Sequence, residues 1–362
     1  MMTRKQILGL GLMLTLATVM VLPMRPEVGK AGQVGSTYKV LAPISRGNLT
    51  IFPVVADRTH DTQNFLTLDE GVRSGEVVVS EAGSVRPLIR GHQGYIPRDG
   101  AEVNRLVLVN NSDRPLILLA GEIVTGGKQD RVVGKDRIVP PKSDPIDLAV
   151  FCVEPGRWVA TKSDFGSFHF QMAQPSVRRS AMADQDQQKV WAEVHATAQS
   201  VAVEASPAAA RAIGGTSSYA GVMANEEVKR KVDAVAVPIE QSYLGLMREL
   251  RERNAVGVVV AVNGRIIWAD MFASTSLLEK YWPKLIRSYA AEALTQGRNA
   301  ERPEMKDAQA FLDDFGARHE AQETEPGVFR RTELTGSDFT AFALTSLLPG
   351  TGFDVHIAKM VD

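Results

Sequence analysis

Cysteine is almost absent from this sequence, which holds only Cys152 in 362 residues. A single thiol cannot form an intramolecular disulfide, so the fold must rest on its apolar core. Cys152 itself lies in the apolar run from Leu148 to Val153, which favours a buried small hydrophobe. The alternative, a nucleophile, would need a base and an electropositive setting that the sequence does not display.

Motifs of metal and hydrolase sites are also missing. No H-E-x-x-H, G-x-S-x-G or G-x-x-x-x-G-K-[ST] pattern occurs, and the six histidines have no metal-ligand spacing: His60, His92, His169, His195, His319 and His356. A formal net charge of −1 gives no electrostatic case for nucleic acid. We therefore expect no metal, no cofactor and no nucleic-acid partner.

Charge is sparse at the N-terminus, where Arg4 and Lys5 precede an apolar run over residues 7–22. A basic region followed by an apolar segment is typical of a secretory signal. The run is slightly long for a signal core and slightly short for a membrane span, so residues 1–31 are either a cleaved signal or a retained anchor. In both cases we expect the body of the protein outside the cytoplasm, periplasmic or secreted, touching a membrane only through this segment.

Residues 38–166 carry mainly strand patterns. Residues 48–57 alternate apolar and polar side chains, and Thr67 is placed to cap a short helix that ends at Gly75. Residues 104–111 and 114–124 predict a hairpin with a longer loop, and Pro140-Pro141 must end a strand. Many short strands with turns between them predict an antiparallel β sandwich or open barrel.

Residues 180–253 are rich in helix formers. A helix is expected over residues 187–205, then a break at 214–221, then two helices separated near Pro238. Residues 256–272 form the clearest local pattern, two β-branched strands around Asn263-Gly264, the pair suited to a two-residue turn.

A long helix over residues 274–296, a helix over 305–318 and final strands complete the chain. The fold class is therefore α+β, with residues 256–362 an α+β segment that packs with the β-rich part as one unit and carries a second antiparallel sheet with helices. The sequence does not indicate an oligomeric state.

Polar residues concentrate in the stretch GEIVTGGKQDR, where Gly126-Gly127 precede four side chains: Lys128, Gln129, Asp130 and Arg131. A cation beside backbone amides suits a phosphate or carboxylate ligand. The alternative is a solvated turn with local ion pairs that contribute little. Spacing alone leaves both interpretations open.

The segment VEPGRW offers a second constellation. Arg157 beside Trp158 permits cation–π stacking, and Glu154 is placed to hold the guanidinium. The set would either clamp an anionic or aromatic ligand, or satisfy itself and lock the end of a strand. Two carboxylates are candidates for a catalytic acid or base. Glu122 lies near a strand end, and Glu154 follows a buried strand.

With these segments together, the chain resembles the ARPP domain family, the ADP-ribosylglycohydrolase- and rhodanese/phosphatase-associated proteins. The resemblance rests on LLAGEIVTGGKQDR, IVPP and VFCVEPGRW, supported by QQKVWAEV and GVVVAVNGRIIWADMF. The family has no established reaction. Its recurrent polar positions fall on Glu122, Lys128, Gln129, Asp130, Arg131, Glu154, Arg157 and Trp158, with Asp130 where Asn is common.

Three functions remain open from the sequence. One is an exported protein that binds an anionic ligand, nucleotide- or ADP-ribose-derived, through Lys128, Arg131 and Arg157. The second is an enzyme acting on such a ligand with Glu122 or Glu154 as acid/base. The third is a structural or interaction protein whose motifs only stabilise the fold.

Overall fold

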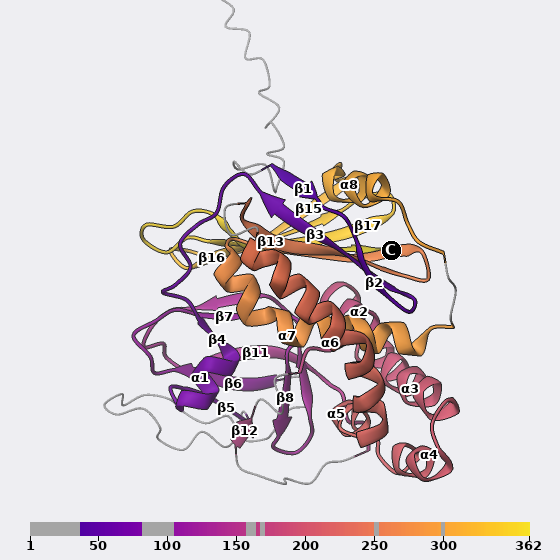
Figure 1. Cartoon of the computed structure of the whole chain (residues 1–362). Coiled ribbons are helices and arrows are strands. Elements are labelled where there is room, and N and C mark those ends of the chain that lie inside the picture. The colour runs from indigo at the N-terminus through magenta and orange to yellow at the C-terminus, as the bar shows by residue number, and fades with distance from the viewer. Residues whose placement is uncertain (1–36, 82–104, 157–163, 167–170, 250–252, 298–300) are drawn as a thin grey trace, which may run out of the picture. The chain divides into compact units, whose positions relative to one another are not determined.

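The fold combines a small β-barrel, a large antiparallel sheet and a set of helices packed against both (Figure 1). The computed structural model describes residues 37–81, 105–156, 164–166, 171–249, 253–297 and 301–362, and these belong to one compact unit. The predicted α+β class is confirmed. The N-terminal apolar run, residues 7–22, lies outside the described part, and none of the described helices is long and apolar enough to cross a membrane.

The barrel is a closed ring of six short strands in the order β11-β6-β5-β12-β8-β9. Their bounds are β5 Val77–Glu81, β6 Arg105–Asn110, β8 Ile123–Gly126, β9 Arg131–Val133, β11 Ile146–Cys152 and β12 Asp164–Gly166. Alternate apolar side chains fill its interior, including Leu106, Leu108 and Val133. A three-stranded sheet lies beside it in the order β10-β7-β4, with β4 Leu66–Thr67, β7 Leu116–Leu118 and β10 Arg137–Val139.

The large sheet draws strands from both ends of the sequence. Its order is β1-β3-β13-β14-β18-β17-β16-β15, with β2 also pairing with β3. The bounds are β1 Tyr38–Val40, β2 Ile44–Arg46, β3 Leu49–Ala56, β13 Ala255–Val262, β14 Arg265–Phe272, β15 His319–Glu325, β16 Phe329–Thr335, β17 Phe339–Ser346 and β18 Asp354–Val361. Because β3 pairs with β13, the first segment of the chain completes a sheet formed mainly by the last.

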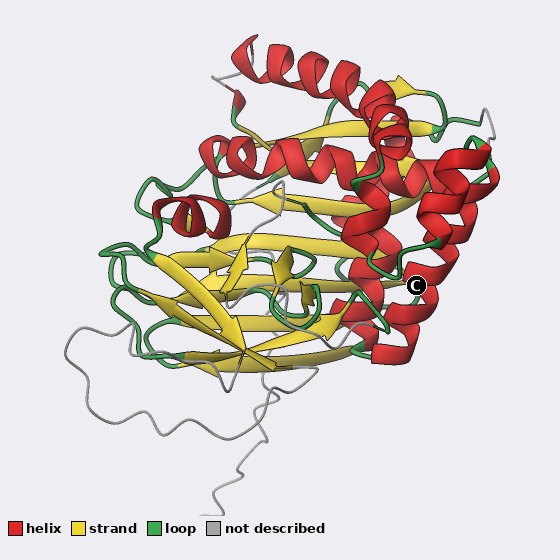
Figure 2. Ribbon diagram, turned by 90° about the horizontal axis from the view of Figure 1, so that it is seen from below, coloured by secondary structure: helices red, strands yellow, loops and turns green. Residues whose placement is uncertain are grey.

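Helices cover the sheet and meet the barrel. Their bounds are α1 Leu68–Ser74, α2 Pro175–Arg179, the π-helical turn η2 Ser180–Asp184, α3 Gln187–Val203, α4 Pro207–Gly214, α5 Tyr219–Met223, α6 Glu226–Glu249, α7 Thr275–Thr295 and α8 Met305–Asp313. Helix α7 lies beside α6 and contacts β3, β13 and β14 (Figures 1 and 2). The main core therefore lies between α6, α7 and the sheet, and it extends to Ile117 and Ile138 beside the barrel.

Several local predictions are confirmed. Thr67 forms a full capping box with Glu70, and Gly75 ends α1 in a left-handed conformation. Asn263 and Gly264 join β13 to β14 with φ values of 52° and 79°, the positive pair that a type I′ turn requires. Ser274, the first residue of the helix expected over residues 274–296, is the N-cap of α7.

Three local predictions are wrong, one for strands and two for helices. Strands β6 and β7 do not form a hairpin, because β6 pairs with β5 and β11 whereas β7 pairs with β4 and β10. The turn predicted at residues 111–115 instead connects a barrel strand to the three-stranded sheet. The Asn110 side-chain amide stabilises this connection by donating to the carbonyls of Arg114 and Pro140.

The helix expected to break near Pro238 is continuous as α6. Proline removes one backbone donor, but Ala236, Ile239 and Tyr243 are fully buried beside it. Their burial outweighs the lost hydrogen bond, since tertiary packing supplies most helix stability in proteins. The helix expected over residues 305–318 ends earlier, at Asp313.

Candidate functional site

The two signature segments identified in the sequence contact each other. The side-chain amide of Gln129 donates to the Glu154 carbonyl at 3.1 Å, and the Asp130 N–H donates to Glu154 Oε2 at 3.0 Å. Val153 N–H donates in turn to the Asp130 carbonyl at 3.0 Å. These bonds join the loop after β8 to the end of β11. The described residues of GGKQDR and VEPGRW therefore contact each other directly.

The remaining polar groups of GGKQDR also contact protein. Asp130 accepts from the Ser218 hydroxyl at 2.7 Å and from Gly126 N–H at 3.2 Å. Lys128 is half-buried, and its N–H donates to Glu81 at 2.8 Å. Arg131 is fully buried, and that burial lowers the pKa of its guanidinium despite nearby acidic groups. The other predicted ligand residues, Arg157 and Trp158, lie outside the described residues.

Glu122 also makes contacts beyond the barrel. Its Oε1 lies 2.5 Å from the ammonium nitrogen of Lys284 on α7, and its Oε2 accepts from Leu119 N–H at 2.7 Å. The same ammonium lies 2.8 Å from Asp69 Oδ2 on α1 and 4.5 Å from the ring centroid of Tyr281. One lysine thus joins three segments that are far apart in sequence.

Burial and charge act against each other in this cluster. Burial raises the pKa of Glu122, and the attraction of Lys284 only partly offsets it because Asp69 competes for the same cation. Burial alone would lower the pKa of Lys284, but the two carboxylates reverse that effect and raise it. Lys284 is therefore a permanent buried cation near neutral pH.

Lys284 also lines a pocket enclosed by α5, α6, α7 and residues 171–172, here called the Lys284 pocket, with a volume of about 310 Å³. Its apolar wall includes Met172, Met223 and Val232. One turn after Lys284 on the same helix, Ser288 is 2% exposed and its hydroxyl has no hydrogen-bond partner within the described residues. The side-chain carbonyl of Gln171, on another wall, is likewise without a partner there.

The comparisons with known proteins give one result. The model of the ARPP-1 family, the ARG and Rhodanese-Phosphatase-superfamily-associated Protein domain, matches residues 37–359. The chain belongs to the ARPP-1 family. No curated protein and no solved structure matches it.

This ARPP-1 chain also contains a fully buried charged network that no sequence motif predicted. The imidazole of His356 on β18 contacts Asp136 through Nδ1 at 2.6 Å and Asp270 on β14 through Nε2 at 3.0 Å. Arg178 on α2 forms two bonds to Asp270, at 2.9 and 3.1 Å, and Tyr289 on α7 donates to it as well. Two carboxylates are balanced by two cations, which is what burial of such groups requires.

The pKa shifts follow from this balance. Burial lowers the pKa of His356, but Asp136 and Asp270 raise it to about 9. Burial alone would raise the pKa of Asp270, whereas Arg178 and His356 hold it well below its usual range. The network connects the barrel, the large sheet and the helices. All of its side chains are buried, so none of them is accessible to a ligand. The available signal was a charge in the middle of an apolar strand, as in WADMF and DVHIAKM.

Gly121 connects the ARPP-1 signature to this network. Its φ is +96°, and a Cβ placed there would lie 2.5 Å from Cγ of Arg178. Only glycine accommodates both the conformation and the close approach. The neighbouring Ala120 N–H donates to Asp136 at 2.7 Å. The segment GEIVTGGKQDR therefore contacts the buried network through Gly121 and contacts Lys284 through Glu122.

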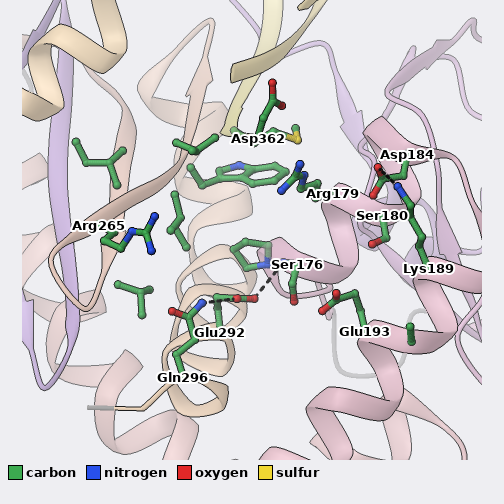
Figure 3. A pocket seen from close by; sticks show the side chains of 18 residues that line it. Ser176, Arg179, Ser180, Asp184, Lys189, Glu193, Arg265, Glu292, Gln296 and Asp362 are labelled. Carbon is green, nitrogen blue, oxygen red and sulfur yellow. Dashed lines mark hydrogen bonds and ion pairs between the residues drawn. The ribbon is translucent and has the colours of Figure 1, made fainter. Parts of the chain in front are cut away.

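A second cavity of about 400 Å³ lies where β14 begins and β18 ends, under α2, α3 and the end of α7, and is here called the Arg179 cleft (Figure 3). Its charged lining includes Arg179, Lys189, Glu193, Arg265 and Glu292. Among the residues that the structure describes, no group of three or more His, Cys, Asp or Glu side chains could hold a metal ion.

Proposed function

We propose that this ARPP-1 chain is a binding protein for a small anionic ligand, and that the Lys284 pocket is its site. The observation that carries the proposal is the pairing, one turn apart on α7, of a buried ammonium with a buried hydroxyl that lacks a partner among the described residues. A buried hydroxyl without a partner costs free energy, which a ligand would recover by bonding to it.

The chemistry of the lining suits an anion with an apolar part. The charged lining has three cations, Lys229, Lys284 and Arg287, and two carboxylates, Glu226 and Asp233, while Met172, Met223 and Val232 offer apolar surface. Arg287 is held in place by Asp233 and Glu240, at 3.1 and 3.0 Å. A volume of about 310 Å³ is at the lower end for small-molecule sites, so a sugar phosphate or part of a nucleotide fits better than intact ADP-ribose.

The signature segments have an indirect part in this proposal. Glu122 fixes the ammonium of Lys284 at 2.5 Å, and the bonds between residues 126–131 and 153–154 fix the barrel that carries Glu122. The polar residues Lys128, Gln129, Asp130 and Arg131 then support the site from a distance.

A thermal-shift panel of inorganic phosphate, sugar phosphates, mononucleotides and ADP-ribose tests the proposal, because a ligand of the folded state raises the melting temperature. Ser288→Ala should leave the unliganded protein at least as stable as the parent, since its hydroxyl has no partner to lose. The same variant should weaken ligand binding about tenfold. Ser200→Ala on α3 is the matched control and should change neither quantity. Unchanged affinity in Ser288→Ala would contradict the proposal.

One observation favours catalysis in the same pocket as a second candidate. The pKa of Glu122 is raised by burial, as a general acid near neutral pH requires, and its partner Lys284 lines the pocket. Glu154 is less suited, because its carboxylate accepts the Asp130 N–H inside the barrel. Product formation from a panel ligand, lost in a folded Glu122→Gln variant, would establish an enzyme; unchanged ligand after prolonged incubation would support binding alone.

We also propose that residues 1–31 direct the protein out of the cytoplasm, on the basis of Arg4, Lys5 and the apolar run that follows. Expression of the full chain with fractionation and N-terminal sequencing tests this. A shortened protein in the periplasm or medium indicates a cleaved signal, an intact one in the membrane fraction indicates an anchor, and an intact one in the cytoplasm overturns the proposal.

A further inference from the structure

The Arg179 cleft is separate from the Lys284 pocket and shares none of its lining residues. It is formed by the first residues of β14, the last of β18, and the helices α2, α3 and α7. Figure 3 shows Arg265 on one side of the cavity and Arg179 on the other. The apolar residues of the lining, here called the apolar floor, include Ile266, Ile267 and Met360.

Some charges in the cleft are already neutralised by protein. Lys189 forms an ion pair with Asp184 at 2.7 Å. The carboxylate of Glu292 accepts three hydrogen bonds: from Ser176 N–H at 3.0 Å, from Gln174 at 3.1 Å and from Gln296 at 2.8 Å. Glu292 is therefore satisfied where it lies and has little capacity left for a ligand.

Two more carboxyl groups line the cleft: burial raises the pKa of Glu193, which lies within electrostatic range of Arg179, and Asp362 accepts from the Thr340 hydroxyl at 2.8 Å. Within the described part of the chain, Arg179 and Arg265 make no ion pair. Trp268, 1% exposed, forms part of the cleft wall, and its indole N–H has no acceptor among the same residues. An indole nitrogen can only donate, so this buried group calls for an acceptor. The Arg178 guanidinium covers the indole at 4.5 Å, which fixes the ring in place.

From these groups we infer that the Arg179 cleft is a second binding site, for a small organic dianion with an acidic group at each end and an apolar chain between. Arg179 and Arg265 each pair with one acidic group, because guanidinium binds carboxylate or phosphate with two parallel hydrogen bonds. The apolar floor contacts the middle of the molecule. The indole N–H of Trp268 donates to an oxygen of the ligand.

Isothermal titration with a series of linear α,ω-dicarboxylates of increasing length tests the inference, with monocarboxylates of equal length as comparison. One length should bind best, and its monocarboxylate should bind at least about tenfold more weakly, since one charged hydrogen-bonding pair is lost. Arg179→Ala and Arg265→Ala should each weaken binding by a similar factor. Trp268→Phe, which retains a ring but lacks the N–H, should have a smaller effect.

Two controls make the outcome specific to this cleft. Arg211→Ala removes an exposed arginine on α4 and should leave binding unchanged. Ser288→Ala alters only the Lys284 pocket and should also leave it unchanged, so the two sites succeed or fail independently. Equal affinity for mono- and dicarboxylates, full affinity in either arginine variant, or no saturable binding at any chain length would overturn the inference.

Discussion

The carboxylate of Glu122 and the ammonium of Lys284 meet at 2.5 Å although the two residues lie 162 positions apart in the sequence. Their contact joins the barrel side of the fold to α7 and sets the one buried lysine of the Lys284 pocket in position. A residue of the ARPP-1 signature thereby reaches the pocket proposed to bind the ligand.

Replacing Lys284 by Met is expected to lower the free energy of unfolding by about 3–5 kcal/mol, because Glu122 and Asp69 would lose their shared cation in a buried site. Urea denaturation measures this loss. Adding Glu122→Gln to the same chain should recover part of it, since one of the two unpaired charges disappears. A double variant no more stable than Lys284→Met would show that the Glu122 charge is not what makes the single change costly.

The pH dependence of stability should report on His356. Its pKa is raised to about 9 in the folded protein, so the folded state keeps a proton that the unfolded state releases near pH 6.5. The stabilisation is fully present below that unfolded value and is lost as the pH rises through about 9. It amounts to about 3 kcal/mol for a shift of this size.

Two measurements check the His356 prediction. NMR titration of the imidazole should show a midpoint near 9. Urea unfolding from pH 6.5 to 9 should give falling stability. Lys359, whose pKa burial lowers to about 8, contributes in the opposite direction from about pH 8 upward, so the series is repeated in Lys359→Met. An imidazole that titrates at its ordinary value would contradict the prediction.

Gly121→Ala should destabilise the protein by about 2–5 kcal/mol, the sum of left-handed strain and forced displacement of the Arg178 side chain. Gly47→Ala is the matched control, because Gly47 also has a positive φ, of 61°, but a methyl group added there would have nothing within 4 Å. It should show the backbone cost alone. Equal losses in thermal denaturation would mean that contact with Arg178 is unimportant.

Asp130→Asn places at this position the residue common in the family and should cost less than about 1 kcal/mol. The amide keeps one acceptor for Gly126 N–H, and the Ser218 hydroxyl can turn to accept from the new amide group. Asp130→Ala removes the carboxylate together with these two bonds and should cost at least about 1–3 kcal/mol. Chemical denaturation of the two variants separates these cases, and equal losses would show that the negative charge itself is required.

Local features of this chain were predictable because their causes are local. The Thr67 capping box, the Asn263-Gly264 turn and the Ser274 cap each depend on a few consecutive residues. The hairpin expected at residues 104–124 was wrong because a turn signal does not specify which strand becomes the partner. Helix α6 continues through Pro238 because the burial of apolar side chains around it outweighs the one backbone hydrogen bond that proline removes. Helix propensity, which a sequence gives, does not include this burial.

The sequence by itself determined the α+β class, the ARPP-1 resemblance and the segments in which polar residues concentrate. Only the tertiary structure decided what those residues contact. Gln129 and Asp130 form hydrogen bonds with Glu154, and Glu122 contacts the distant Lys284. It alone revealed His356 between Asp136 and Asp270. The physical reason is that a buried charge needs a partner in space, and strand pairing brings that partner from any distance along the chain.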